Sequence, residues 1–259
     1  MGNDRRCNAI PDDIHERRTH VHECVDAKDE KNRCGRKMKV AYDAIKSFIL
    51  RENLDEQTRL TEDLLSKQLG IGKSPVRHAL NSLSTEGLVR IEARRGAYLR
   101  QFSRKEVLDL YNLREALEVY AVATAELTPK FLTELRRSVQ RTQKLLKSKD
   151  KQSHIDEDTY FHGMIAEATG NAELCRVLSN LQSQIWLCRR KTYDLSASSA
   201  PDAHRAILYA LEKGDRKAAQ TAMHRHIALV RERLLAFIDH SSARNGTEEA
   251  LRIPRRSRR

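Results

Sequence analysis

"TEDLLSKQLGIGKSPVRHALNSLSTEGLVRIEARRGAYL", residues 61–99, is the stretch that decides the fold of the N-terminal part of the chain. Thr61 is a good helix N-cap, acidic residues follow it in the first turn, and Gly70 is a common stop signal. Ser74 offers a second N-cap, and Pro75 suits the first position of another helix. The stretch therefore predicts two short helices joined by the tight turn "GIGK".

The sequence on either side completes a recognisable order of elements. Upstream, "VAYDAIKSFIL" carries Val40, Ile45, Phe48 and Ile49 at helical spacing, which predicts a preceding helix. Downstream, two short β-rich runs flank Arg95 and Gly96 and predict a hairpin. Three helices followed by a hairpin is the order of a winged helix-turn-helix domain. In such a domain, the N-terminal end of the third helix enters the major groove of DNA.

The predicted DNA contacts lie at that helix end and on the hairpin, or wing. Cations and a hydroxyl there can reach phosphates and base edges, and a glycine permits close approach of the backbone. A single exposed arginine is more often only a solvated charge, so the expectation depends on the complete pattern. The expected contacts are Lys73, Ser74, Arg77 and His78 on the helix, and Arg94, Arg95 and Gly96 on the wing.

These residues resemble the DNA-binding domain of the GntR family of bacterial transcriptional regulators. The resemblance is carried by "LSKQLG", "KSPVRHAL", "GLV" and the wing "RRG". It implies DNA contacts from the third helix and places Gly96 at the tip of the wing. The chain departs from the family pattern, with Gly72 for a serine, Lys73 for an arginine and His78 for a glutamate. Because Lys73 cannot make the bidentate fork that arginine makes to guanine, the operator sequence is not implied.

The composition favours helices and restricts the class of protein. The 259 residues are 39% hydrophobic and 32% charged, with few glycines, prolines and aromatics. No apolar run approaches the length of a membrane span, so no membrane partner is expected. The five cysteines form no C-x-x-C pair, which indicates free thiols in a reducing cytoplasm. The net charge of +12 is weak evidence for nucleic acid, since five arginines lie in the last nine residues.

The C-terminal part reads as one helix after another, so the predicted fold is mainly α. Ser103 and Glu106 have the spacing of a capping box, and Val107, Leu110, Leu117 and Ala121 then mark an apolar face. The predicted helices cover residues 104–127, 129–148, 153–169, 171–193, 201–213 and 216–240. The predicted domains are a disordered charged tail (1–37), the winged helix-turn-helix domain (38–102), the helical domain (103–242) and a basic tail (243–259).

Asp158 and His162, in "DTYFHGMIAEATGN", lie four residues apart and so on one face of a helix. They can hold a metal ion, act as an acid–base pair, or hydrogen-bond to each other. His204 lies near a predicted helix start, and His226 shares a face with apolar residues, whereas His224 falls off that face. Taken singly, each histidine is more often an ordinary core or surface residue. Together, one carboxylate and three imidazoles suit Zn²⁺, Ni²⁺, Mn²⁺ or Fe²⁺.

A second resemblance bears on this choice. Residues 103–240 are similar to the effector-binding FCD domain of the FadR subfamily, through "NLREALE", "D-x-x-F-H", "TGN", "HRAILYALEKGD" and "HRHI". In its metal-binding members, the matching ligands are Asp158, His162, His204 and His226. The family pairs an arginine of the first helix with an acidic effector, and here that residue is Arg114. A structural ion pair between Arg114 and a nearby glutamate stays equally open. Arg189 and Arg190 are further candidates for the pocket, but a surface position is expected for both.

These observations favour a cytoplasmic, metabolite-responsive regulator, with repression as the expected mode. It would bind double-stranded operator DNA as a homodimer, because a two-fold operator calls for a two-fold protein. Its helical domain would bind a divalent metal and a small organic acid. Two alternatives stay open at this point: a helical metallohydrolase, and a regulator whose metal is purely structural.

Overall fold

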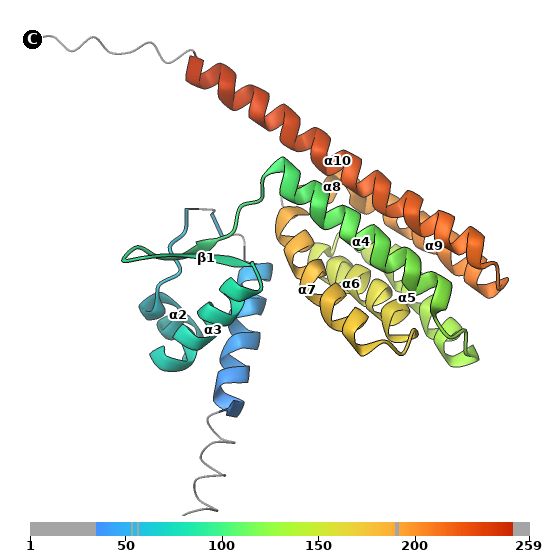
Figure 1. Cartoon of the computed structure of the whole chain (residues 1–259), viewed down its shortest axis with the longest axis horizontal. Helices are drawn as coiled ribbons and strands as arrows, with labels where there is room; N and C mark the ends of the chain where they lie inside the picture. The colour runs from blue at the N-terminus through green and yellow to red at the C-terminus, as the bar shows by residue number, and fades with distance from the viewer. Residues whose placement is uncertain (1–34, 53, 56, 190–191, 251–259) are drawn as a thin grey trace, which may run out of the picture.

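The computed structural model describes residues 35–52, 54–55, 57–189 and 192–250. Most of the predicted N-terminal tail, Arg190, and residues 251–259 of the predicted basic tail lie outside this part. Figure 1 shows a small N-terminal domain beside a bundle of helices, with the strap between β2 and α4 joining them. The fold is mainly α, as predicted. None of the helices in the described ranges is both long and apolar enough to cross a membrane.

The N-terminal domain has the predicted winged helix-turn-helix order. A helix over residues 35–51 precedes α2 and α3, and a two-stranded antiparallel sheet follows with Val89 paired to Leu99. The elements are α2 (Glu62–Leu69), α3 (Lys73–Thr85), β1 (Val89–Glu92) and β2 (Gly96–Leu99). The apolar face of the first helix consists of Ala41, Ile45 and Ile49, whereas Val40, predicted on that face, is 58% exposed.

Both caps of α2 agree with the sequence prediction, whereas the N-cap of α3 does not. The Thr61 hydroxyl accepts a hydrogen bond from the Leu64 amide, and Gly70 closes α2 in the left-handed conformation, as predicted. The prediction that Ser74 caps α3 is wrong, because Gly72 is the N-cap and makes no side-chain bond. Ser74 therefore lies in the first helical turn with its side chain exposed.

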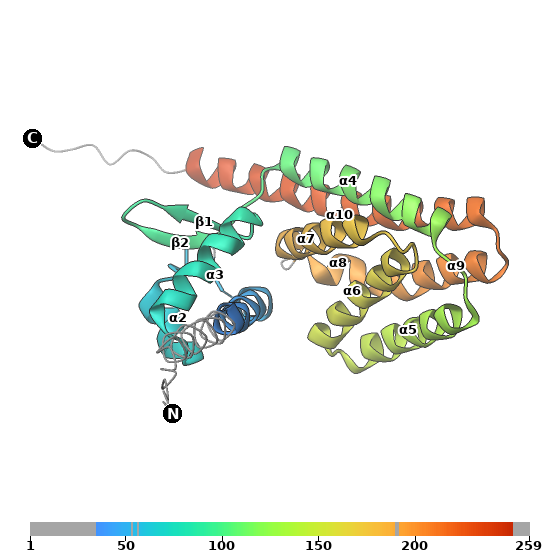
Figure 2. The same cartoon turned by 60° about the horizontal axis from the view of Figure 1, so that its bottom comes forward.

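Helices α4 to α10 form the C-terminal domain, and α4 lies alongside α10 in both views (Figures 1 and 2). The Ser103–Glu106 capping box is present at the start of α4. The last helix continues ten residues beyond the predicted end at 240. The elements are α4 (Arg104–Thr124), α5 (Pro129–Ser148), α6 (Lys151–Glu167), α7 (Ala172–Arg189), α8 (Tyr193–Ser196), η1 (Ala197–Ser199), α9 (Ala200–Glu212) and α10 (Arg216–Ala250).

The buried face of α4 contains charged residues, which shifts it from the predicted apolar face. Spacings of four and three along the helix bury Val107, Tyr111, Arg114, Glu118 and Ala121. The predicted leucines of this helix pack only partly against the core. Two charges can share this position because Arg114 and Glu118 are four residues apart and form an ion pair with each other.

Helix α7 joins the two domains. Leu187 is buried with the apolar core of the N-terminal domain, although it belongs to the bundle. The Trp186 Nε1 donates a hydrogen bond of 2.9 Å to the carbonyl of Leu50, near the end of the first helix. The Gln184 Nε2 donates one of 2.8 Å to the carbonyl of Glu86, just after α3. The orientation of the winged domain is thereby fixed against the last turns of α7.

Candidate functional site

The expected DNA contacts on α3 are exposed on one end of the helix, and two of them are already paired. The Lys73 Nζ lies 2.6 Å from the Asp63 carboxylate. The Arg77 guanidinium donates two hydrogen bonds, of 2.7 and 2.9 Å, to Glu62. Ser74 and His78 are exposed beside them. Helix α2 thus supplies acids that hold the cations of α3 in defined positions.

Arg59 lies beside the wing and was not among the DNA contacts expected from the sequence. Arg94 and Gly96 both have positive φ, 62° and 105°, and shape the turn. A Cβ on Gly96 would lie 2.9 Å from the Arg59 Nε, so the glycine leaves room for that side chain. Arg59 and Arg94 are exposed and make no ion pair with any residue in the described part. The bridge between Leu60 and Ala97 brings Arg59 to the wing, and the sequence alone does not reveal this pairing.

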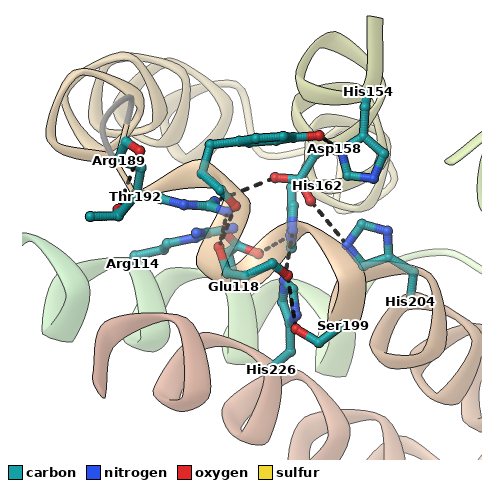
Figure 3. Close-up of polar contacts among 12 residues, drawn as sticks. Arg114, Glu118, His154, Asp158, His162, Arg189, Thr192, Ser199, His204 and His226 are labelled. Carbon is teal, nitrogen blue, oxygen red and sulfur yellow. Dashed lines mark hydrogen bonds and ion pairs between the residues drawn. The ribbon is translucent and has the colours of Figure 1, made fainter. Parts of the chain in front are cut away.

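The four expected metal ligands converge in the middle of the helical domain (Figure 3). Asp158 and His162 come from α6, His204 from α9 and His226 from α10. One potential ligand atom from each residue lies within 4.8 Å of all the others. The Nε2 atoms of His162 and His226 are 3.3 Å apart, and the Nε2 of His204 is 3.3 Å from an Asp158 oxygen. The structure thus brings together residues from three helices that lie far apart in the sequence.

The protonation states of these residues suit a divalent ion. Burial lowers the pKa of His204 and of His226, so both imidazoles are neutral and have a free lone pair. Burial alone would raise the pKa of Asp158, but contact with His204 and the nearby positive groups hold it well below its usual value. Both ring nitrogens of His204 are buried without a well-directed hydrogen bond. Three imidazoles and one carboxylate match the donor set expected for Zn²⁺, Ni²⁺, Mn²⁺ or Fe²⁺.

Glu118 supports the ligand set, although the sequence analysis did not name it. Its Oε2 contacts the Nδ1 of His162, which leaves the His162 Nε2 facing His226. Its Oε1 accepts a hydrogen bond of 2.6 Å from the Arg114 Nε. Burial alone would raise the pKa of Glu118, but Arg114 and His162 lower it to about 2. A carboxylate on the second nitrogen of a ligating histidine fixes the tautomer and strengthens the ligand.

Two arginines lie beside this cluster. Arg114, for which an effector contact and an ion pair were both open, forms the buried ion pair with Glu118 and also lines a cavity. The expectation that Arg189 lies on the surface is wrong, because its side chain is only 11% exposed and lines the same cavity. Its guanidinium lies 3.6 Å from Asp158 and donates a 3.1 Å hydrogen bond to Ser196. The segment α8–η1, which follows the end of α7, supplies that burial.

The cavity is small in this conformation. Its volume of about 30 Å³ corresponds to room for one water molecule. Trp186 and Ile185 contribute apolar walls, and Asp158 and His162 form the side that faces the ligand cluster. The cavity therefore connects the metal ligands to the helix that holds the winged domain.

Comparison with known proteins identifies both halves of the chain. The model of the bacterial regulatory proteins of the gntR family matches residues 37–99, and that of the FCD domain matches residues 109–229. The chain is 28% identical to the Uxu operon transcriptional regulator of Escherichia coli, over 74% of this chain and 84% of the relative. It is 23% identical to the gluconate operon transcriptional repressor of Bacillus subtilis, over 76% of this chain and 84% of the relative.

Solved structures show the same fold. A GntR transcriptional regulator from Rhodococcus sp. RHA1 superposes with a TM-score of 0.70 and 19% identity, covering 78% of this chain and 98% of that one. McbR/YncC of Escherichia coli gives 0.69 and 19%, covering 80% and 98%. The matched families are transcription regulators rather than enzymes, which sets the hydrolase interpretation aside.

The ligand assignment predicts which histidines retain metal. We expect His204→Ala and His226→Ala to lose most of the metal that the parent carries, about one ion per chain. His224→Ala should retain it, because His224 is exposed and pairs with Glu115 instead. Elemental analysis of the purified proteins measures this difference. Equal metal loss from the His224 and His226 variants would contradict the assignment.

The contact between Glu118 and His162 predicts a second effect. Glu118→Gln keeps the size of the side chain but removes the charge, so metal affinity should fall by about 10- to 100-fold. Competition with a chelating dye measures the affinity, and a melting curve checks the fold. Glu115→Gln, at a half-buried position of the same helix that pairs with Arg231 and not with a proposed metal ligand, is the matched control and should bind metal like the parent. Parental affinity in Glu118→Gln would show that this carboxylate does not support the site.

Proposed function

Since the chain belongs to the GntR family of bacterial transcriptional regulators and carries an FCD domain, we propose that it is a cytoplasmic repressor controlled by a small organic acid. The observation that carries this proposal is the convergence of Asp158, His162, His204 and His226 beside a cavity lined by two arginines. That cavity touches the helix that holds the winged domain. A ligand in that cavity is well placed to change the orientation of the winged domain.

DNA binding is proposed for the exposed end of α3 and for the wing. Two copies of the chain, as a homodimer, would place two such ends on a two-fold operator. Lys73, Arg77, Arg94 and Arg95 would displace counterions from the phosphates, with Ser74 and His78 beside them on the helix and Gly96 at the wing tip. Arg59, next to the wing, adds a further cation to this surface.

The metal and the acid are proposed to share one site. A bound divalent ion supplies a Lewis-acid position that a carboxylate oxygen can occupy. Glu118 holds His162 in the ligating orientation, and Arg114 keeps Glu118 ionised in the core. Arg114 also lines the cavity, so its guanidinium can meet a polar group of the effector while its Nε holds Glu118.

Two structural connections support transmission of effector binding to the winged domain. Helix α4, which carries Arg114 and Glu118, starts only a few residues after the wing strand β2. Helix α7 contributes Trp186 to the cavity wall and, through the same side chain, bonds to Leu50 of the first helix. Effector binding can shift the winged domain only if the effector binds one orientation of that domain more tightly than another.

Arg77→Ala tests the DNA surface. We expect the operator Kd to rise by roughly 5- to 100-fold, because a groove-facing cation is lost, while the fold is retained. Binding by the parent should also weaken steeply with salt. Fluorescence anisotropy with operator DNA, taken from the promoter region of the chain's own gene, measures both effects. Arg136→Ala, an exposed and ion-paired arginine of α5, is the matched control and should bind like the parent. Parental affinity in folded Arg77→Ala would refute the placement of the recognition helix.

The effector response tests the regulatory proposal as a whole. A panel of short carboxylic acids should contain one that releases the metal-loaded protein from operator DNA, and chelation should abolish that release. Arg114→Ala would leave Glu118 buried without its partner, so Arg114→Lys is the informative variant. It should keep its metal but need about tenfold more acid for release, since lysine lacks the planar fork. A metal that raises the melting temperature without any acid response would instead indicate a purely structural ion.

A further inference from the structure

The cavity beside the metal ligands has an excess of unpaired hydrogen-bond donors. The Nε of Arg189 and the Nε2 of Gln182 are buried and have no hydrogen-bond partner within the described ranges. The Nε2 of His154 is also buried and unpaired, and its other ring nitrogen contacts the Tyr193 hydroxyl. All of these side chains line the cavity. Buried donors without partners cost free energy, so the cavity favours a ligand rich in acceptor atoms.

The two arginines of the cavity differ in how firmly they are held. Arg114 is committed to Glu118 through a 2.6 Å hydrogen bond in a fully buried ion pair. Among the residues that the structure describes, Arg189 has a 3.6 Å contact with Asp158 and a hydrogen bond to the neutral Ser196. Asp158 is itself a proposed metal ligand, so an ion would compete for that carboxylate. Arg189 is therefore the cation with more capacity to bind a carboxylate from outside.

The charge balance indicates how many negative charges the ligand brings. Arg114 forms an ion pair with Glu118, and the guanidinium of Arg189 faces the carboxylate of Asp158, so these four charges cancel in pairs. A divalent ion in the cluster would add two positive charges that no described side chain of the site balances. In a site of low dielectric, a ligand with two negative charges neutralises this excess better than one with a single charge.

From these observations we propose that the effector is a small dicarboxylate and that Arg189 binds its second carboxylate, with Gln182 and His154 donating to the same group. This inference rests on the proposed function and specifies the chemical class of its effector. Ile185 and Trp186 also line the cavity, and their apolar surfaces would contact the carbon chain between the two carboxylates.

The size of the cavity adds a mechanical consequence. A dicarboxylate does not fit in about 30 Å³, so its wall must move when the ligand binds. Trp186 belongs to this wall and donates to the Leu50 carbonyl of the winged domain. Arg189 lies about one helical turn beyond Trp186. Trp186 and Gln184, which precedes it on the same helix, both hydrogen-bond to the winged domain. Binding of a carboxylate by Arg189 would therefore move the end of α7 that contacts the winged domain.

The test compares acids of equal carbon number on the full chain loaded with zinc. The probes are succinate against butyrate and malonate against propionate, titrated by calorimetry and by the fluorescence of Trp186, the single tryptophan. At least one diacid should bind about tenfold more tightly than its matched monoacid. Arg189→Gln should abolish that preference while zinc content and monoacid affinity stay within about twofold of the parent.

Two further variants complete the design. Arg176→Gln removes an exposed arginine from the same helix and should retain the parental preference. Arg189→Lys keeps the charge without the fork, so about a threefold loss of preference is expected, and this variant decides the question if Arg189→Gln does not fold.

The outcomes separate this inference from the proposed function. An equal affinity of the parent for diacids and monoacids overturns the inference but leaves an acid-responsive regulator intact. An undiminished preference for diacids in folded Arg189→Gln, or in Arg189→Lys if only that variant folds, overturns the role of Arg189. No binding of any of these acids to the zinc-loaded parent would count against both proposals.

Discussion

The buried ion pair between Arg114 and Glu118 is the interaction on which the helical domain depends. Both charges lie on the core face of α4, where either one alone would be costly, so each requires the other. Because Arg114 lowers the pKa of Glu118, Glu118 faces His162 as an anion. This contact sets the ring orientation of His162, a proposed metal ligand. The same pair therefore determines how α4 packs, how α6 presents its histidine, and how much of Arg114 is left for an effector.

Helix α7 gives this arrangement a path to the winged domain. Within one turn and a half it contributes Gln184 and Trp186 to contacts with that domain, Leu187 to its apolar core, and Arg189 to the cavity. Because one short helical segment makes all of these contacts, a shift of the segment at one contact disturbs the others. The coupling between the cavity and the winged domain is direct, because Trp186 lines the cavity and hydrogen-bonds to the first helix.

The sequence predicted those features that are encoded locally. Thr61 and the Ser103–Glu106 pair are caps whose signals lie within one turn, and helical periodicity separated buried His226 from exposed His224. Ser74 is not the cap because α3 starts earlier, with Gly72 in the extended N-cap conformation and Ser74 already within the helix. The burial of Glu118 and Arg189 depends on packing between helices. The spacing of Glu118 from Arg114 was visible in the sequence, but only the fold shows that α8 and η1 cover Arg189.

The acids of α2 impose a different constraint on the proposed DNA surface. Glu62 orients the Arg77 guanidinium through two hydrogen bonds, and Asp63 does the same for Lys73 through one contact. Phosphates must compete with these carboxylates, so part of the counterion-driven, sequence-independent attraction is lost. When a base edge accepts hydrogen bonds from a guanidinium that is already held in place, fewer rotamers are fixed on binding. The entropic cost of that contact is therefore lower. Pairing the cations within the protein therefore lowers affinity for arbitrary DNA more than for a matching operator, and discrimination is a difference between those two affinities.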